Sequence, residues 1–169
     1  LSGSFPYFGG TTSTLTVCSN GFVSVATGNG TGYAPSAAGW LSSVAPRFGM
    51  WHDYNPAAAG SGSVKFQQIG AIAYVTWDGV FSYGRTTGGS RWQLQFDTAT
   101  GNVTCAIQSV DSQGSTTNVG NQSLAGGASA GPSDDLGSMD ITASLPAKFR
   151  ISRDNLQPLS ETGTLPQIG

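Results

Sequence analysis

The side chains of this sequence that could carry out chemistry are few. The 169-residue chain has two cysteines and one histidine, and Asp, Glu, Lys and Arg make up 9% of it. His52 and Asp53 are adjacent, and neighbouring side chains of an extended segment point to opposite sides, so Asp53 is poorly placed to orient His52. No Gly-x-Ser-x-Gly nucleophile turn is present. We interpret this segment as a strand end where Asp53 and Asn55 bond local backbone, and we predict that the chain is not an enzyme.

The acidic residues allow two alternatives to that prediction. Asp53 and Asp78 could converge with loop aspartates as the paired carboxylates of a glycosidase. The loop aspartates alone are the best candidates for a calcium site, because calcium prefers oxygen ligands, although no EF-hand spacing exists. No other metal site is expected. We therefore predict no cofactor, with calcium as the alternative at Asp134, Asp135 and Asp140.

The cysteines are expected to lie in the core. Asn20-Gly21 between β-rich runs predicts a two-residue hairpin turn, which places Cys18 opposite Val23 on one face of the hairpin. Cys105 follows the same alternation in a later strand. A Cys18–Cys105 disulfide is therefore geometrically reasonable and would indicate an oxidising compartment, whereas two free buried thiols are the alternative.

Aromatic residues in or beside loops are a third candidate for function. Trp40, Trp51 and Tyr54 could form a platform that stacks on sugar rings, as in a carbohydrate-binding module. The alternative is that these rings pack in the core or at its edge. The same question does not arise for Trp92, which alternates with Leu94 and Phe96 on one face of a half-buried strand.

The elements that position these residues are predicted to be strands. Short alternating runs recur every 8–12 residues with turn signals between them, which is typical of a β-sandwich or barrel. We predict a single all-β domain over residues 1–153, an antiparallel β-sandwich of jelly-roll or Ig-like shape with long Gly/Ser/Ala-rich loops. Residues 154–169 have no periodicity and are expected to form a linker or an extended assembly arm, in which the apolar positions are Leu156, Leu159, Leu165 and Ile168.

Composition excludes several partner classes. The net charge is −2, so there is no basic patch to neutralise phosphates, and nucleic-acid binding is not expected. No apolar run reaches the length of a membrane span. Low charge and high Ser, Thr and Gly content favour a secreted, extracellular or cell-surface protein. The triplets that begin at Asn29, Asn102 and Asn121 match the glycosylation sequon, which arises easily by chance in such a composition.

Several short motifs, taken in order, resemble a known group. They include Phe5-Pro6-Tyr7-Phe8-Gly9, Val17-Cys18-Ser19-Asn20-Gly21-Phe22-Val23, Trp51-His52-Asp53-Tyr54-Asn55-Pro56, Val75-Thr76-Trp77-Asp78 and Leu94-Gln95-Phe96. This string resembles the β-sandwich modules of large secreted bacterial surface proteins and, more distantly, the nidogen-type extracellular domain. The resemblance implies a non-enzymatic adhesive or assembly module with no catalytic residues to transfer. Such modules often have an acidic residue where this chain has His52.

The resulting hypothesis is a structural, adhesive module of a surface or matrix protein. Its expected partners are other copies of itself or neighbouring surface-protein domains. A terminal arm that adds to the sheet edge of a neighbouring copy would build a filament, because a head-to-tail contact does not close on itself. A carbohydrate-binding module with glycan partners is the alternative.

Overall fold

The chain folds into three antiparallel sheets. The computed structural model describes residues 1–117, 124–128, 145–151, 153 and 158–162. A two-stranded sheet pairs β1 (Phe5–Tyr7) with β2 (Gly10–Thr12), and the one helix of the described residues is α1 (Ala37–Leu41). The all-β, antiparallel fold class is confirmed. The jelly-roll or Ig-like sandwich shape stays a prediction.

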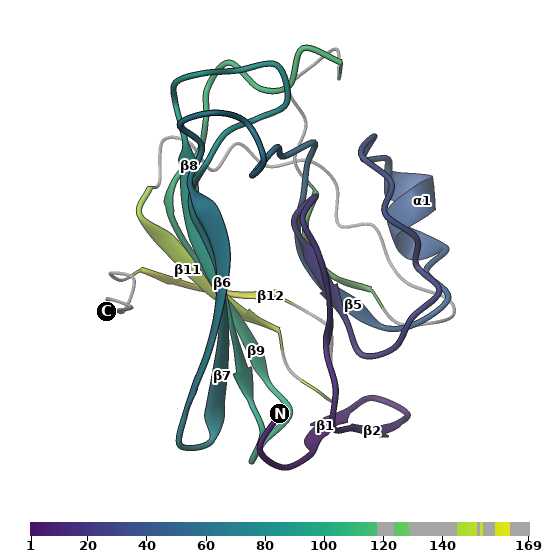
Figure 1. The fold of residues 1–169 in the computed structure, drawn as a ribbon. Coiled ribbons are helices and arrows are strands. Elements are labelled where there is room, and N and C mark those ends of the chain that lie inside the picture. Colours follow the sequence, from purple (N-terminus) through teal and green to yellow (C-terminus); the bar gives the residue numbers. More distant parts are fainter. Residues whose placement is uncertain (118–123, 129–144, 152, 154–157, 163–169) are drawn as a thin grey trace.

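The two larger sheets contain four and six strands. The four-stranded sheet has the order β10-β5-β4-β3, and the six-stranded sheet has the order β12-β11-β9-β8-β7-β6. In Figure 1 the two sheets lie beside each other, and α1 flanks β5 on the side away from the larger sheet. The strands are β3 (Thr16–Cys18), β4 (Phe22–Ser24), β5 (Arg47–Trp51), β6 (Ser63–Ile69), β7 (Ile72–Val80), β8 (Ser90–Asp97), β9 (Val103–Ser109), β10 (Leu124–Ala128), β11 (Ala147–Ile151) and β12 (Pro158–Thr162).

One hydrophobic core contains residues from both larger sheets. Val23 and Met50 from the smaller sheet pack in the same cluster as Leu94 and Phe96 from the larger one. The predicted alternation of β8 is confirmed, because Trp92, Leu94 and Phe96 are all fully buried. Cross-strand pairing places Trp92 opposite Trp77, and their rings stack with centroids 4.1 Å apart. The core therefore lies between the two sheets and is centred on β7, β8 and β9.

The hairpin at Asn20-Gly21 forms with a different register from the predicted one. Cys18 pairs with Phe22, not with Val23, so the loop has three residues, and the Gly21 N–H donates to the Cys18 carbonyl oxygen at 3.0 Å. Gly21 has a φ of +91°, and a Cβ there would lie 2.1 Å from the Met50 carbonyl oxygen. A three-residue loop that ends in a left-handed glycine is a common hairpin type. The close approach of β5 makes glycine necessary at this turn.

This register change explains why the predicted disulfide does not form. A shift of one residue moves a side chain to the other face of a sheet. Cys18 therefore packs with Phe22, Trp40 and Trp51, whereas Cys105 lies in the core between the sheets. Both cysteines are free and buried, so the structure has the free-thiol alternative instead of the bridge.

Part of the predicted C-terminal arm belongs to the six-stranded sheet. Residues 158–162 form β12, which pairs antiparallel with β11 in the register Arg150↔Leu159. This differs from the expectation of a free arm beyond residue 153, because the strand that precedes it offers an unpaired edge to the same chain. The candidate arm residues Leu156, Leu165 and Ile168 lie outside the described residues.

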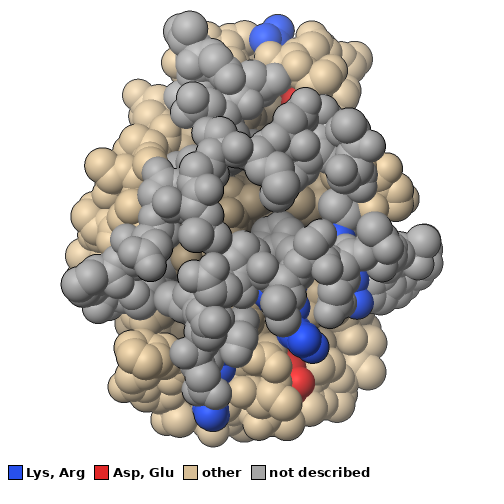
Figure 2. Space-filling model, turned by 180° about the vertical axis from the view of Figure 1, so that it is seen from behind, with Lys and Arg blue, Asp and Glu red and all other residues tan. Residues whose placement is uncertain are grey.

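The described surface carries little charge. On the face shown in Figure 2, uncharged residues dominate the described part and blue and red atoms are scattered among them. This agrees with the low charged fraction of the sequence. Among the described residues, no helix has the length and apolar character that crossing a membrane requires.

Candidate functional site

A buried polar cluster lies where β5 ends, and it includes the single histidine. His52 Nε2 is 3.0 Å from Ser82 Oγ. The segment that carries Ser82 is held by backbone bonds to the β5 end, since the Asn55 N–H donates to the Phe81 carbonyl and the Tyr83 N–H to the Asp53 carbonyl. A histidine beside a serine hydroxyl is the geometry of a base and a nucleophile.

The Asp53 carboxylate binds residues outside the His52–Ser82 pair. Its Oδ2 accepts a hydrogen bond from Ser115 Oγ at 2.7 Å and another from Thr117 Oγ1. The expectation that Asp53 bonds local backbone is therefore wrong, although Asn55 does so through the Ala57 N–H. Asp53 ties β5 to a loop that is more than 60 residues away in the sequence, which is why no local pattern indicated this contact.

Burial decides what this cluster can do. Ser82 is 0% exposed and His52 is 3% exposed, so neither has an open face for a substrate. An acyl-transfer site needs a position about 3 Å from the nucleophile in which the substrate carbonyl can sit. Here the His52 imidazole contacts the Ser82 hydroxyl, and the Asp53 carboxylate accepts from the Ser115 and Thr117 hydroxyls. These contacts join three loop segments near the end of β5.

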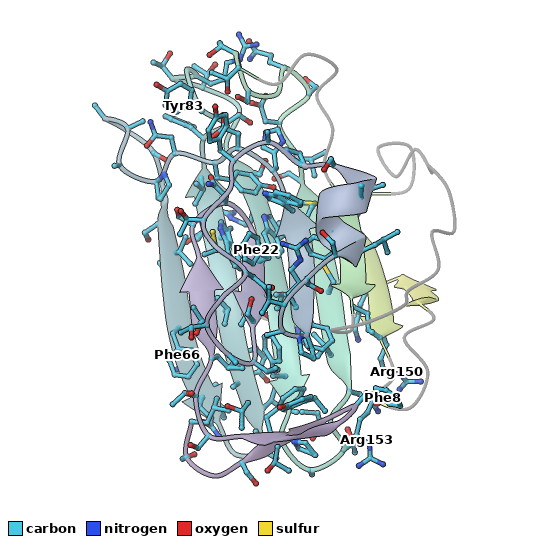
Figure 3. The ribbon with its side chains drawn as sticks, turned by 90° about the vertical axis from the view of Figure 1, so that its right-hand side faces the viewer. Phe8, Phe22, Phe66, Tyr83, Arg150 and Arg153 are labelled. Atoms are coloured by element: carbon cyan, nitrogen blue, oxygen red, sulfur yellow. The ribbon has the colours of Figure 1, made fainter. Side chains whose placement is uncertain are left out.

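A second cluster covers the other face of the four-stranded sheet. Phe22, labelled in Figure 3, contacts Trp40 and Trp51 edge to face, and Trp40 from α1 stacks on Trp51 with ring centroids 6.0 Å apart. The Arg47 guanidinium lies 4.6 Å from the Trp40 ring centroid and 4.8 Å from that of Trp51. Burial lowers the pKa of Arg47, and it raises the pKa of the neighbouring Cys18 thiol. The rings therefore hold a buried cation.

The predicted glycan platform is contradicted by this packing. Trp40, Trp51 and Tyr54 are each no more than 6% exposed, so none presents a ring face to a sugar. Tyr54 belongs to the main core and not to the ring cluster, and burial strongly raises the pKa of its phenol. The rings come from α1, from the end of β5 and from the segment just after it, and they fill the core and the outer face of the four-stranded sheet, which is the packing alternative.

The remaining candidate sites do not assemble among the described residues. Within that part of the chain, no three His, Cys, Asp or Glu side chains gather as metal ligands. The calcium candidates Asp134, Asp135 and Asp140 lie outside it, as does the sequon residue Asn121. The Asn29 side chain is structural, because its Nδ2 donates to Ser24 Oγ and the Ala45 carbonyl at 2.9 and 2.7 Å.

The two edge strands of the six-stranded sheet are the feature that remains. Neither β6 nor β12 has a second partner strand among the described residues. Next to β6, a groove of about 450 Å³ runs between the sheets, and Val17, Val64 and Phe66 contribute apolar side chains to it. An unpaired strand edge presents N–H and C=O groups that can bind another strand. The position of β6 at an edge has no signal in the sequence, because strand order is set by tertiary pairing.

A comparison of this chain with known protein families, curated proteins and solved structures gave no significant match. The resemblance to secreted surface-protein modules therefore stays a prediction.

Proposed function

We propose that this chain is a non-enzymatic structural module of an extracellular or cell-surface protein, and that it associates with its own copies through the edges of its six-stranded sheet. The observation that carries the proposal is that both edges of this sheet lack a further strand among the described residues. Main-chain hydrogen bonds across such an edge give affinity without a specialised pocket. Low charge and the motif string support an extracellular location.

The state of the polar groups also supports a non-enzymatic role. The groups that most resemble catalytic residues, His52, Ser82 and Asp53, are buried and bonded to protein partners. A fluorophosphonate probe, which reacts with activated serines, is expected not to label the folded chain. Labelling that disappears in Ser82→Ala, in a variant that still folds, would replace the structural role with a hydrolase.

The central test is association of the purified chain. Light scattering at increasing concentration should show growth of the mean mass, and negative-stain electron microscopy should show linear particles. A chain that stays monomeric up to millimolar concentration would rule out self-association as its function.

A further inference from the structure

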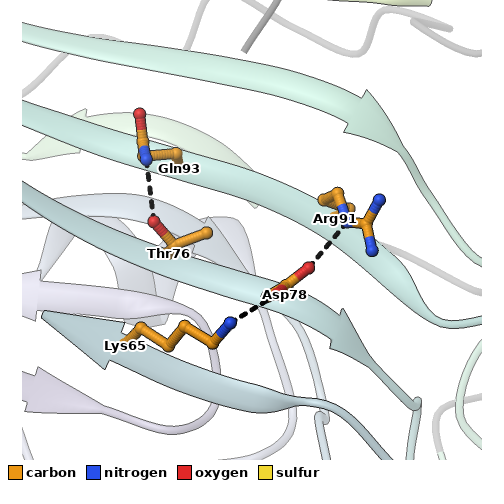
Figure 4. Close-up of polar contacts among 5 residues, drawn as sticks. All are labelled: Lys65, Thr76, Asp78, Arg91 and Gln93. Carbon is orange, nitrogen blue, oxygen red and sulfur yellow. Dashed lines mark hydrogen bonds and ion pairs between the residues drawn. The ribbon is translucent and has the colours of Figure 1, made fainter. Parts of the chain in front are cut away.

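The register of the six-stranded sheet connects a lysine on one edge strand to a glutamate position on the other. Register pairs connect Lys65 on β6 to Thr76, Gln93, Ala106 and Lys148 in turn, and Lys148 is paired with Glu161 on β12. Figure 4 shows the first part of this row, with Lys65 on β6 and Thr76 bonded to Gln93 across β7 and β8. The row thus begins with a cation at one edge and ends with an acidic residue at the other.

The directions of the two edge strands also allow antiparallel pairing between copies. Each strand of the sheet runs antiparallel to its neighbour, and the sheet has six strands. With an even number of strands, β6 and β12 run in opposite directions. Two copies placed side by side by translation would therefore pair β12 of one with β6 of the next in antiparallel orientation, the arrangement already used throughout this sheet.

A similar charge pattern, an acidic residue between two cations, exists next to the β6 edge, where Arg91 is directly opposite Asp78 and Lys65 is diagonal to it. Asp78 on β7 bonds a cation on each neighbouring strand, Lys65 at 2.8 Å and Arg91 at 2.7 Å. Figure 4 shows these two pairs side by side. At the junction, position 161 would have Lys148 of its own chain on one side and Lys65 of the next copy on the other.

The apolar side of β6 is also left uncovered. Phe66 pairs with the core residue Val75, yet it is 54% exposed. In Figure 3, Phe66 lies at one edge of the molecule and Arg150 of β11 lies toward the opposite side. A strand added beside β6, with 161 opposite 65, places Ser160 opposite Phe66 and removes water from part of the ring. Directly opposite side chains are the units that stabilise a sheet.

We infer that the partner is a second copy of this chain, whose β12 edge pairs antiparallel with the β6 edge so that Glu161 is opposite Lys65. This inference rests on the proposed function and names its contact. A lysine in the middle of an edge strand discourages unselective pairing. Here the same lysine selects a strand with an acidic residue at the facing position.

Charge exchange tests the pairing directly. Lys65→Glu and Glu161→Lys each place like charges at the junction, and each is expected to lower the association constant by about tenfold or more. In an equal mixture the two variants can alternate along the polymer, and every junction between them then pairs a lysine with a glutamate. The mixture should therefore regain association. Light scattering measures all three samples.

A matched control separates the junction from the fold. Lys65→Glu also disturbs the ion pair with Asp78, and Arg91→Glu disturbs the other pair of the same aspartate from an interior strand. Arg91→Glu should leave association unchanged, and circular dichroism should show the same β content in every variant.

The outcomes separate the inference from the proposed function. Wild-type association that survives both single variants, or a mixture that stays dissociated, would overturn the β12–β6 junction and leave self-association standing. A wild-type chain that does not associate would overturn both.

Discussion

Arg47 shows how a buried charge is accommodated without a carboxylate. The residue is 3% exposed, and its guanidinium makes no ion pair among the described residues and donates to the Gly39 carbonyl. Three aromatic rings lie within 5.2 Å of it, measured from the guanidinium carbon to the ring centroids. Cation–π attraction grows when both groups are removed from water. The arginine stem and the rings together join α1 to the four-stranded sheet.

We predict that Arg47→Ala lowers the free energy of unfolding by about 2–4 kcal/mol, because it removes both the stem packing and the cation at the rings. Arg47→Met keeps much of the volume without the charge and should cost clearly less. Urea denaturation followed by tryptophan fluorescence measures both. The exposed Arg91→Ala is the control, with an expected loss of about 1 kcal/mol or less. A loss from Arg47→Met as large as that from Arg47→Ala would show that the charge, and not the packing, matters.

The thiols give a second prediction at this scale. Burial raises the pKa of Cys18 and strongly raises that of Cys105, so both stay protonated and unreactive in the fold. A thiol reagent such as DTNB should react very slowly with the native chain and should titrate both cysteines after denaturation without reductant. A denatured chain that gave no free thiol would show that Cys18 and Cys105 form a disulfide and would contradict the free-thiol state.

At the scale of elements, the sequence predicts best where the pattern is local and repeated. Trp92, Leu94 and Phe96 alternate over a full strand, and β8 forms as expected. Cys18 shows the limit, because the choice between a two-residue and a three-residue turn at Asn20-Gly21 depends on the close approach of β5. That choice decides which face Cys18 occupies, and with it the disulfide prediction.

Contacts between segments that are distant in the sequence also depend on tertiary packing, so no local pattern predicts them. Ser115 and Thr117 have no local signature, and they become partners of Asp53 only because the loop after β9 returns to the end of β5. Trp40 lies in a Gly/Ala/Ser-rich segment, and Trp51 lies where an expected strand gives way to a loop, which made both rings candidates for exposure. The helix α1 and the outer face of β5 bury them together.

The ion pairs of Asp78 with Lys65 and Arg91 make stability depend on pH. The hydrogen bond from Lys65 is the main cause that lowers the pKa of Asp78 below its ordinary value of 3.8. A lowered pKa in the fold means that this contribution is fully present above that value and is lost as the pH falls through the folded-state pKa. Asp78→Asn should therefore cost about 1 kcal/mol or less at pH 7, and the difference should shrink at pH 3. Urea denaturation at the two pH values measures it. An equal difference at both pH values would contradict the assignment.

At the scale of the whole molecule, the proposed junction fixes a dimension. Strands in a sheet lie about 4.8 Å apart, so six strands per copy give a repeat of about 29 Å along a continuous sheet. Electron micrographs or fibre diffraction of the assembled chain should show this spacing. The strand direction would lie across the long axis, since growth follows the hydrogen bonds. A repeat set by the long dimension of the strands would instead indicate end-to-end contacts.

The even number of strands in the six-stranded sheet also determines how a copy without β12 would affect polymer growth. A chain that lacks β12 still offers β6 and so can receive a full-length neighbour, but its other border is β11, which runs in the same direction as the β6 that would have to follow. Such a copy would join a growing polymer at one end and block further addition there. A small fraction of truncated chains, as proteolysis near the C-terminus would produce, would thus act as a terminator that limits polymer length.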